Sequence, residues 1–255
     1  MTRPDTNPDA TEMTPEELAA AVAEFDLNRH TARLLTDEPF FAALSRRINK
    51  KASGALPTAG VRVTDDGHFE MLYNPAFFAK LTDVQRAGVL KHEFYHLVFE
   101  HVTGRLPDAG MSKMWNIATD LAINSHLVGQ LPEQCCMPGE GPFADMPLGK
   151  SAEFYFAALK KKAEENEGEG EGGPGEPGDG DGSGSDMGDS FDDHSGWGEG
   201  QGAAQDIAKE RLKESVKKAA EEAQKANSWG SVSSQCRRDI LDRIASKVDW
   251  RKVLR

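Results

Sequence analysis

The segment from Val89 to His101 contains the motif H-E-x-x-H within a pattern that is typical of an α-helix. Residues four apart lie one above the other on a helix, so His92 and His96 project from one face and can offer two imidazole nitrogens to one tetrahedral metal ion. Glu93 lies one step further round, where its carboxylate can reach a water bound to that metal. The motif therefore predicts a zinc site with Glu93 as its general base.

The residues around the motif predict a long, buried helix. Thr82 and Gln85 have capping-box spacing, and from there to Thr103 the chain has no proline and only Gly88 as a weak point. Buried histidines and a buried glutamate need partners, because a buried polar group without one costs roughly 2–7 kcal/mol. Metal ligation would supply them, and the alternative is a pair of core histidines bonded to carbonyl groups, with a solvated glutamate between them in the sequence. Apolar residues surround the helix almost completely: Val89, Leu90, Phe94, Leu97, Val98, Phe99 and Val102.

A second helix is expected to supply the third metal ligand. Ser112 is a candidate N-cap for a helix from Met114 to Asn124. Asn116, Asp120 and Asn124 stand at positions i, i+4 and i+8, so they form one polar stripe on a helix that is otherwise mainly apolar. A carboxylate between two amides, on a helix antiparallel to the first, can complete a His-His-carboxylate site. We therefore predict Asp120 as the third ligand, with the asparagines orienting it. The alternative is a solvated polar face.

His101 competes for the third ligand position, because His92, His96 and His101 together resemble a three-histidine site. On a continuous helix its side chain would point about 140° away from that of His96, so it could bind the metal only if the helix broke just before it. The stretch 97–100 contains no helix breaker. His101 is therefore predicted to pack beside the site, and Glu100 to continue the face of His92 and His96, where it could bond a ligand histidine.

Upstream of the motif, the sequence predicts two helices and a β-hairpin. Capping signals and apolar spacing indicate helices at about residues 15–25 and 37–47. Apolar residues then alternate with polar ones over 61–63 and again over 69–73, on either side of a turn signal at 65–67. An edge strand beside a metal-binding helix can bind an extended peptide by strand addition. The alternative is a hairpin that only covers the core.

The net charge of −12 is concentrated in one segment. Residues 164–193 contain twelve acidic residues and no Lys or Arg, and the rest of the chain has 30 acidic and 30 basic residues. No basic stripe for nucleic acid is present. Residues 166–190 are mainly glycine, proline and acid, which predicts a disordered linker. We therefore expect a core at 1–165, this linker, and a helical segment at 191–255 that completes or caps the core.

His194 lies directly after this linker, in a cluster of acidic and aromatic residues that runs from Phe191 to Trp197. Such a cluster could dock over the metal site. The alternative is an N-terminal anchor for the following helix, which the sequence predicts from about Ala203 to Lys225, with an amphipathic pair of helices after it.

Cysteine content and hydropathy bear on the location of the chain. Cys135, Cys136 and Cys236 form neither a C-x-x-C pair nor an even disulfide framework, so they are predicted to be reduced thiols. No apolar run approaches the length of a membrane-spanning helix, and the first thirteen residues are polar and acidic without a signal-peptide core. The expected location is cytoplasmic, without membrane association.

The two predicted helices resemble a known domain family. His92-Glu93-x-x-His96-x-x-x-x-His101, followed by Trp115-Asn116-Ile117-Ala118-x-Asp120-x-x-Ile123-Asn124, is similar to the putative metallopeptidase domain of bacteria and phages that precedes a von Willebrand factor A-like domain. The similarity runs from about Phe40 to the C-terminus, apart from the glycine-rich insert. The chain ends at Arg255, where relatives continue into the A-like domain, so it is either a stand-alone form or a fragment. Further matching pieces are Asn74-Pro75, Ser151-Ala152-Glu153-x-Tyr155, residues 192–197 and residues 248–254.

This resemblance implies a zinc-peptidase fold and site, and it suggests an A-like domain or an AAA-type ATPase system as a partner. Together with the motif it predicts a mostly helical, zincin-like α+β domain. In it, His92, His96 and Asp120 hold Zn²⁺, and Glu93 deprotonates a water for attack on a peptide or protein substrate. The competing hypothesis is a metal-stabilised adaptor or regulatory domain that binds a protein partner and hydrolyses nothing.

Overall fold

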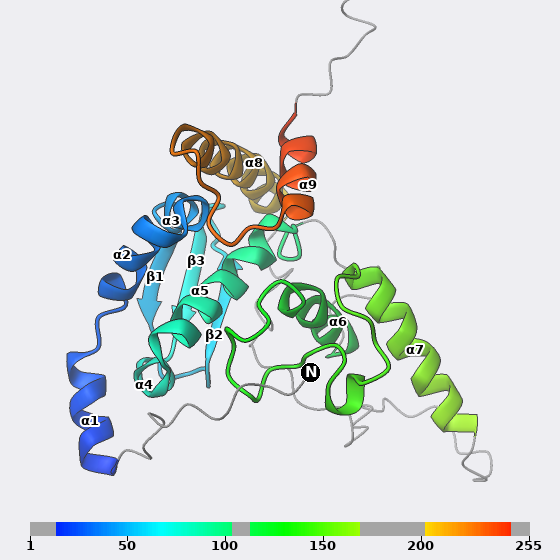
Figure 1. Ribbon diagram of the computed structural model, residues 1–255. Helices are drawn as coiled ribbons and strands as arrows, with labels where there is room; N and C mark the ends of the chain where they lie inside the picture. Colours follow the sequence, from blue (N-terminus) through cyan, green and yellow to red (C-terminus); the bar gives the residue numbers. More distant parts are fainter. Residues whose placement is uncertain (1–13, 104–112, 169–201, 246–255) are drawn as a thin grey trace, which may run out of the picture.

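The computed structural model describes residues 14–103, 113–168 and 202–245, and these ranges are mostly helical with one small sheet (Figure 1). This α+β composition confirms the predicted class. The elements are α1 (Pro15–Glu24), α2 (Leu27–Asp37), α3 (Pro39–Ser45), β1 (Asn49–Ala52), β2 (Ala59–Val63), β3 (Phe69–Tyr73), α4 (Pro75–Lys80), α5 (Asp83–Val98), α6 (Lys113–Asn124), the 3-10 turn η1 (Gly141–Phe143), α7 (Ala152–Gly168), α8 (Gly202–Lys225) and α9 (Ser234–Ile244).

Several predictions concern residues that the structure does not describe. The Ser112 cap, the acidic linker beyond Gly168, the cluster around His194 and the amphipathic stretch after Lys247 all lie outside the described residues. The first residues of the predicted linker are described, and they belong to α7, which continues to Gly168.

The sheet consists of three strands in the order β1, β3, β2. The strands β2 and β3 form the predicted antiparallel hairpin, with Val61 opposite Met71. β1 pairs with β3 in parallel, with Lys50 opposite Met71. We did not predict β1, because its four residues are mostly exposed and show no apolar alternation. β2 is an edge strand of this sheet and packs beside α5. Strand addition by a peptide at that edge stays a prediction.

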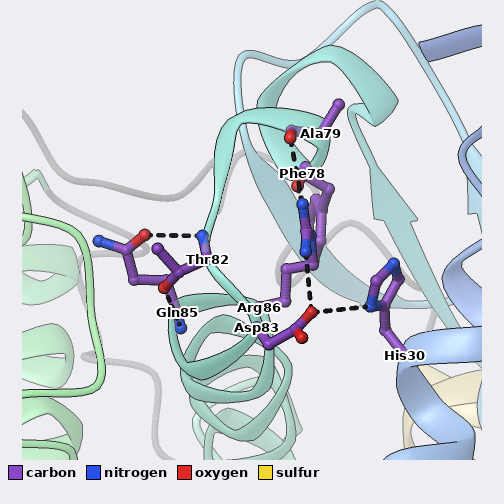
Figure 2. Close-up of polar contacts among 7 residues, drawn as sticks. All are labelled: His30, Phe78, Ala79, Thr82, Asp83, Gln85 and Arg86. Carbon is purple, nitrogen blue, oxygen red and sulfur yellow. Dashed lines mark hydrogen bonds and ion pairs between the residues drawn. The ribbon is translucent and has the colours of Figure 1, made fainter. Parts of the chain in front are cut away.

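The start of α5 is fixed by the predicted capping box and by an arginine (Figure 2). Thr82 donates its N–H to Oε1 of Gln85 (2.9 Å), and Thr82 Oγ1 accepts the N–H of Gln85 (3.3 Å). Arg86 donates to two carbonyls at the end of α4 and to Oδ1 of Asp83 (3.0 Å). His30 on α2 lies 3.7 Å from the same carboxylate oxygen. These contacts join α2, α4 and α5 at one corner of the domain.

Apolar residues form two clusters, and α5 belongs to the larger one. That cluster combines residues of α2, α3, α4 and α5 with the sheet and with α8 and α9, and the smaller one lies between α6 and α7. Trp229, after α8, stacks on Phe40 of α3 with ring centroids 5.3 Å apart. Figure 1 shows α5 between the sheet and α6. In the described ranges no helix has the length and apolar character needed to cross a membrane.

A buried ion pair holds α5 from another side. Nζ of Lys91 lies 2.8 Å from Oε1 of Glu38, and Lys91 is only 3% exposed. Lys91 also donates to Oγ of Ser231 (3.1 Å) and to Oε1 of Gln130, while Glu38 accepts the N–H of Ser231 (2.8 Å). The pair therefore ties α5 to α3, to the segment after α6 and to the α8–α9 loop. Removing one partner of such a pair typically costs about 3–5 kcal/mol.

Gly88 gives the first testable prediction, because α5 and the segment after α6 approach closely there. A Cβ atom at Gly88 would lie 2.0 Å from the carbonyl oxygen of Gln130. Gly→Ala inside a helix ordinarily stabilises by roughly 1 kcal/mol. We expect Gly88→Ala instead to lower the free energy of unfolding by about 1–3 kcal/mol, since the backbone must move apart.

Urea denaturation of the wild type and of Gly88→Ala measures this change in the free energy of unfolding. Gly54→Ala is the control, because a Cβ there meets nothing within 4 Å, and its effect should stay within about 0.5 kcal/mol. A stabilised Gly88→Ala variant would contradict the close approach.

Candidate metal centre

His92, His96 and Asp120 converge between α5 and α6. Nε2 of His92 lies 2.9 Å from Nε2 of His96, and Oδ1 of Asp120 lies 3.6 Å from the first atom and 3.4 Å from the second. All three residues are completely buried. Within the described residues this is the one group of three whose ligand atoms are close enough to share a metal ion. Two ligands of a tetrahedral zinc ion stand about 3.3 Å apart, given bonds of roughly 2.0–2.1 Å, so the spacing suits one ion.

Asn124 determines which nitrogen of His92 is available. Its Nδ2 donates to the carbonyl of Cys136 (2.6 Å), which leaves its Oδ1 as an acceptor 2.7 Å from Nδ1 of His92. His92 must therefore carry its proton on Nδ1, and its Nε2 lone pair faces His96 and Asp120. We predicted that the asparagines orient Asp120. Asn124 instead bonds to His92, a partner that was not predicted for it.

The helix α5 ends at Val98, so the prediction of an unbroken helix to Thr103 is wrong. Glu100 adopts a left-handed conformation, with φ 61°. The N–H of Glu100 bonds to the carbonyl of Leu97, and the N–H of His101 bonds to the carbonyl five residues earlier, both at 2.9 Å. This pair of bonds is a Schellman helix end. Glycine usually occupies the left-handed position of that motif, and a glutamate there is a weak signal in a sequence.

This helix end brings His101 back against His96. Nδ1 of His101 lies 3.2 Å from Nδ1 of His96, and His101 is completely buried. His101 thus contacts the ring nitrogen of His96 that does not face Asp120. Although the helix breaks before it, His101 is not a member of the three-residue group. Glu100 is exposed and lies beyond the last helical residue, so the prediction that it continues the face of His92 and His96 is wrong.

Burial keeps His96 in the form that binds metals. Desolvation lowers its pKa to about 4, although the hydrogen bond with Asp120 acts in the opposite direction. The imidazole is therefore neutral at pH 7. A neutral histidine can offer a nitrogen lone pair to a metal, whereas an imidazolium cannot. His96 offers Nε2 when its Nδ1–H donates to His101.

Two further predicted residues lie on the same helices. Glu93 neighbours His92 on α5; it is completely buried, and both of its carboxylate oxygens are shielded from solvent. Asn116 lies one turn before Asp120 on α6 and is half-buried. Its Oδ1 is shielded from solvent and has no hydrogen-bond partner in the part of the chain that the structure describes.

The donor set fits a divalent zinc ion. Two neutral imidazoles and one carboxylate are ligands that catalytic zinc sites use, and such sites leave a fourth position for water or substrate. The Nε2 lone pair of His92 and Oδ1 of Asp120 are both electron-pair donors, and they lie 3.6 Å apart in a fully buried site. A shared cation could bond to both atoms.

The comparisons with known proteins agree with this site at the level of a family. A family model described as "Putative metallopeptidase domain" matches residues 23–255, a range that contains Glu93 and the three converging residues. No curated protein and no solved structure matches the chain. Because the family model matches most of the sequence, the chain belongs to the putative metallopeptidase domain family.

Proposed function

We propose that this chain is a zinc-dependent peptidase in which His92, His96 and Asp120 bind the metal. The observation that carries the proposal is the convergence of two imidazole nitrogens and one carboxylate oxygen in a fully buried site. The fixed tautomer of His92 supports it, because the lone pair of Nε2 then points toward His96 and Asp120, where a metal could accept it. Membership of a family of the metallopeptidase class supports peptide bonds as the target.

Each residue of the site then has a distinct task. A bound zinc ion would polarise the carbonyl of the scissile peptide bond and lower the pKa of a water molecule in its fourth position. Glu93 would accept a proton from the attacking water and pass it to the leaving amine. Asn124 and His101 would hold the rings of His92 and His96 with their Nε2 lone pairs toward the ion.

The organisation of the chain is proposed on the same basis. We propose a zincin-like core at residues 1–165, a linker at 166–190, whose described residues up to Gly168 belong to α7, and a helical segment at 191–255 that completes or caps the core. Packing of α5 beside β2 supports the zincin-like core, since the proposed metal-binding helix then lies on a sheet with an edge strand next to it. The core residues that α8 and α9 contribute support the role of the C-terminal helical segment.

Zinc content tests the metal ligands directly. Purified protein should hold about one zinc ion per chain, and His92→Ala or His96→Ala should abolish it, because each removes one of three protein ligands. His68→Ala is the control, since that histidine is exposed in the β2–β3 turn. Metal analysis after zinc reconstitution and dialysis measures the ratio. A folded wild type without zinc would end this proposal.

A second measurement separates Asp120 from His101. Asp120→Ala should weaken zinc binding more than His101→Ala, because Asp120 contributes a converging oxygen whereas His101 contacts the far nitrogen of His96. Loss of an orienting partner of a ligand typically weakens metal affinity about 10- to 100-fold, which is the expected effect of His101→Ala. Competition with a chelating dye gives both affinities. A larger loss for His101→Ala would make His101 the ligand.

Glu93→Gln tests the catalytic role. The variant keeps the size and hydrogen-bonding reach of the side chain but cannot accept a proton. It should bind zinc as tightly as the wild type and lose peptide hydrolysis by about 10²–10⁴-fold. Zinc content, melting temperature and peptide cleavage are measured on one preparation.

The outcomes of this test distinguish the two functions. Undiminished cleavage by Glu93→Gln would refute its role as general base. A zinc-loaded wild type that cleaves nothing in a diverse peptide library would favour the adaptor hypothesis. If Glu93→Gln lost only stability or metal content, Glu93 would have a structural role and not a catalytic one.

A further inference from the structure

The polar stripe of α6 continues one turn beyond the three converging residues. Asn124 contacts His92, and Asp120 lies near both His92 and His96, so residue numbers fall along α6 as they rise along α5. The two helices are therefore antiparallel at the site. Asn116 is the next member of the stripe, one helical turn from Asp120, on the side of the site where α5 ends.

The side-chain oxygen of Asn116 is unsatisfied in the described structure. Oδ1 is shielded from solvent and accepts no hydrogen bond, although the residue as a whole is half-buried. Its surroundings are otherwise well fixed, because Thr119 Oγ1 donates to the carbonyl of Asn116 (2.8 Å) and Trp115 packs in the α6–α7 cluster. Leaving a buried acceptor without a donor is unfavourable, and in native structures a water, an ion or a ligand commonly completes such a bond.

The second asparagine of the stripe shows what a purely orienting amide looks like here. Asn124 is completely buried, and both polar atoms of its amide are bonded, one to Cys136 and one to His92. Asn116 differs on each count, because the residue as a whole is half-buried and its Oδ1, although shielded from solvent, accepts no hydrogen bond within the described residues. The two amides therefore have different tasks, although they have the same residue type and the same spacing from Asp120.

We propose that Asn116 is a substrate-binding residue whose Oδ1 accepts a hydrogen bond from a backbone N–H of a peptide bound at the metal centre. The inference rests on the proposed function, since a peptide is the ligand that this function brings to the site. Backbone N–H groups occur along any extended peptide, whatever its side chains. Recognition through Asn116 therefore holds the peptide backbone in place and leaves side-chain preference to other contacts.

The test is a double-mutant cycle in which the protein is changed at Asn116 and the ligand is changed at one backbone amide. The probes are a tripeptide hydroxamate, whose hydroxamate group chelates the metal, and analogues in which each backbone amide is N-methylated in turn. Each probe is titrated into cobalt-loaded protein, and the visible spectrum of the cobalt ion reports binding without any need for catalysis. In the wild type, methylation of one particular amide should weaken binding about tenfold.

In Asn116→Ala the parent hydroxamate should bind about tenfold more weakly than to the wild type, and methylation of that same amide should cost nothing further. Asn116→Asp keeps an acceptor oxygen and should restore the discrimination. Cobalt stoichiometry and affinity should be unchanged in Asn116→Ala. The control is Asn124→Ala, which should lower metal affinity because it removes the partner of His92.

The failures are distinguishable. Binding with equal methylation costs in the wild type and in Asn116→Ala would overturn the role of Asn116 and leave the proposed function standing. Loss of metal in Asn116→Ala would make it part of the metal shell and overturn the inference. A wild type that holds one cobalt ion but binds no hydroxamate would overturn the inference and the peptidase proposal together.

Discussion

The arrangement of the metal centre depends on the hydrogen bond between His92 and Asn124, which joins α5 to α6. This bond leaves the Nε2 lone pair of His92 facing Asp120. Oδ1 of Asn124 can accept from His92 because the carbonyl of Cys136 accepts from Nδ2 and so fixes the orientation of the amide. The two helices must therefore keep a fixed relative position. The close approach of Gly88 to the carbonyl of Gln130 maintains it, only six residues beyond Asn124.

The end of the chain supports the same helix from a distance in sequence. Nη1 of Arg243 on α9 donates to the carbonyl of Val98 (3.2 Å), where α5 has just ended and its carbonyls lack helical partners. The α8–α9 loop reaches α5 through Ser231 and Lys91. Burial raises the pKa of Cys236 on α9 to about 12, so this thiol stays protonated at neutral pH and acts as a packing group. The helices α8 and α9 and the loop between them therefore support α5, the helix that carries His92 and His96.

Sequence patterns predicted the parts of this structure that depend on local periodicity. The shared face of His92 and His96 follows from helical spacing within α5, the stripe that contains Asp120 follows from the same spacing within α6, and the capping box at Thr82 acts over three residues. The Schellman end was missed because Glu100, not a glycine, adopts the left-handed conformation. The partner of Asn124 and the burial of Lys91 depend on which segments meet in three dimensions, which periodicity does not encode. β1 was missed because it is short and mostly exposed.

The buried acidic residues give a physical reason why a divalent ion would stabilise this site. Lys91 is the one buried Lys or Arg among the described residues, and Glu38 holds its Nζ. Glu93 and Asp120 are two further buried acids, and the neighbouring His96 is neutral at pH 7 because burial lowers its pKa to about 4. An ionised carboxylate in a low-dielectric interior is costly unless positive charge is close by. A divalent cation bound by His92, His96 and Asp120 would supply that positive charge at Asp120, so metal binding and stable folding of the α5–α6 pair should be linked.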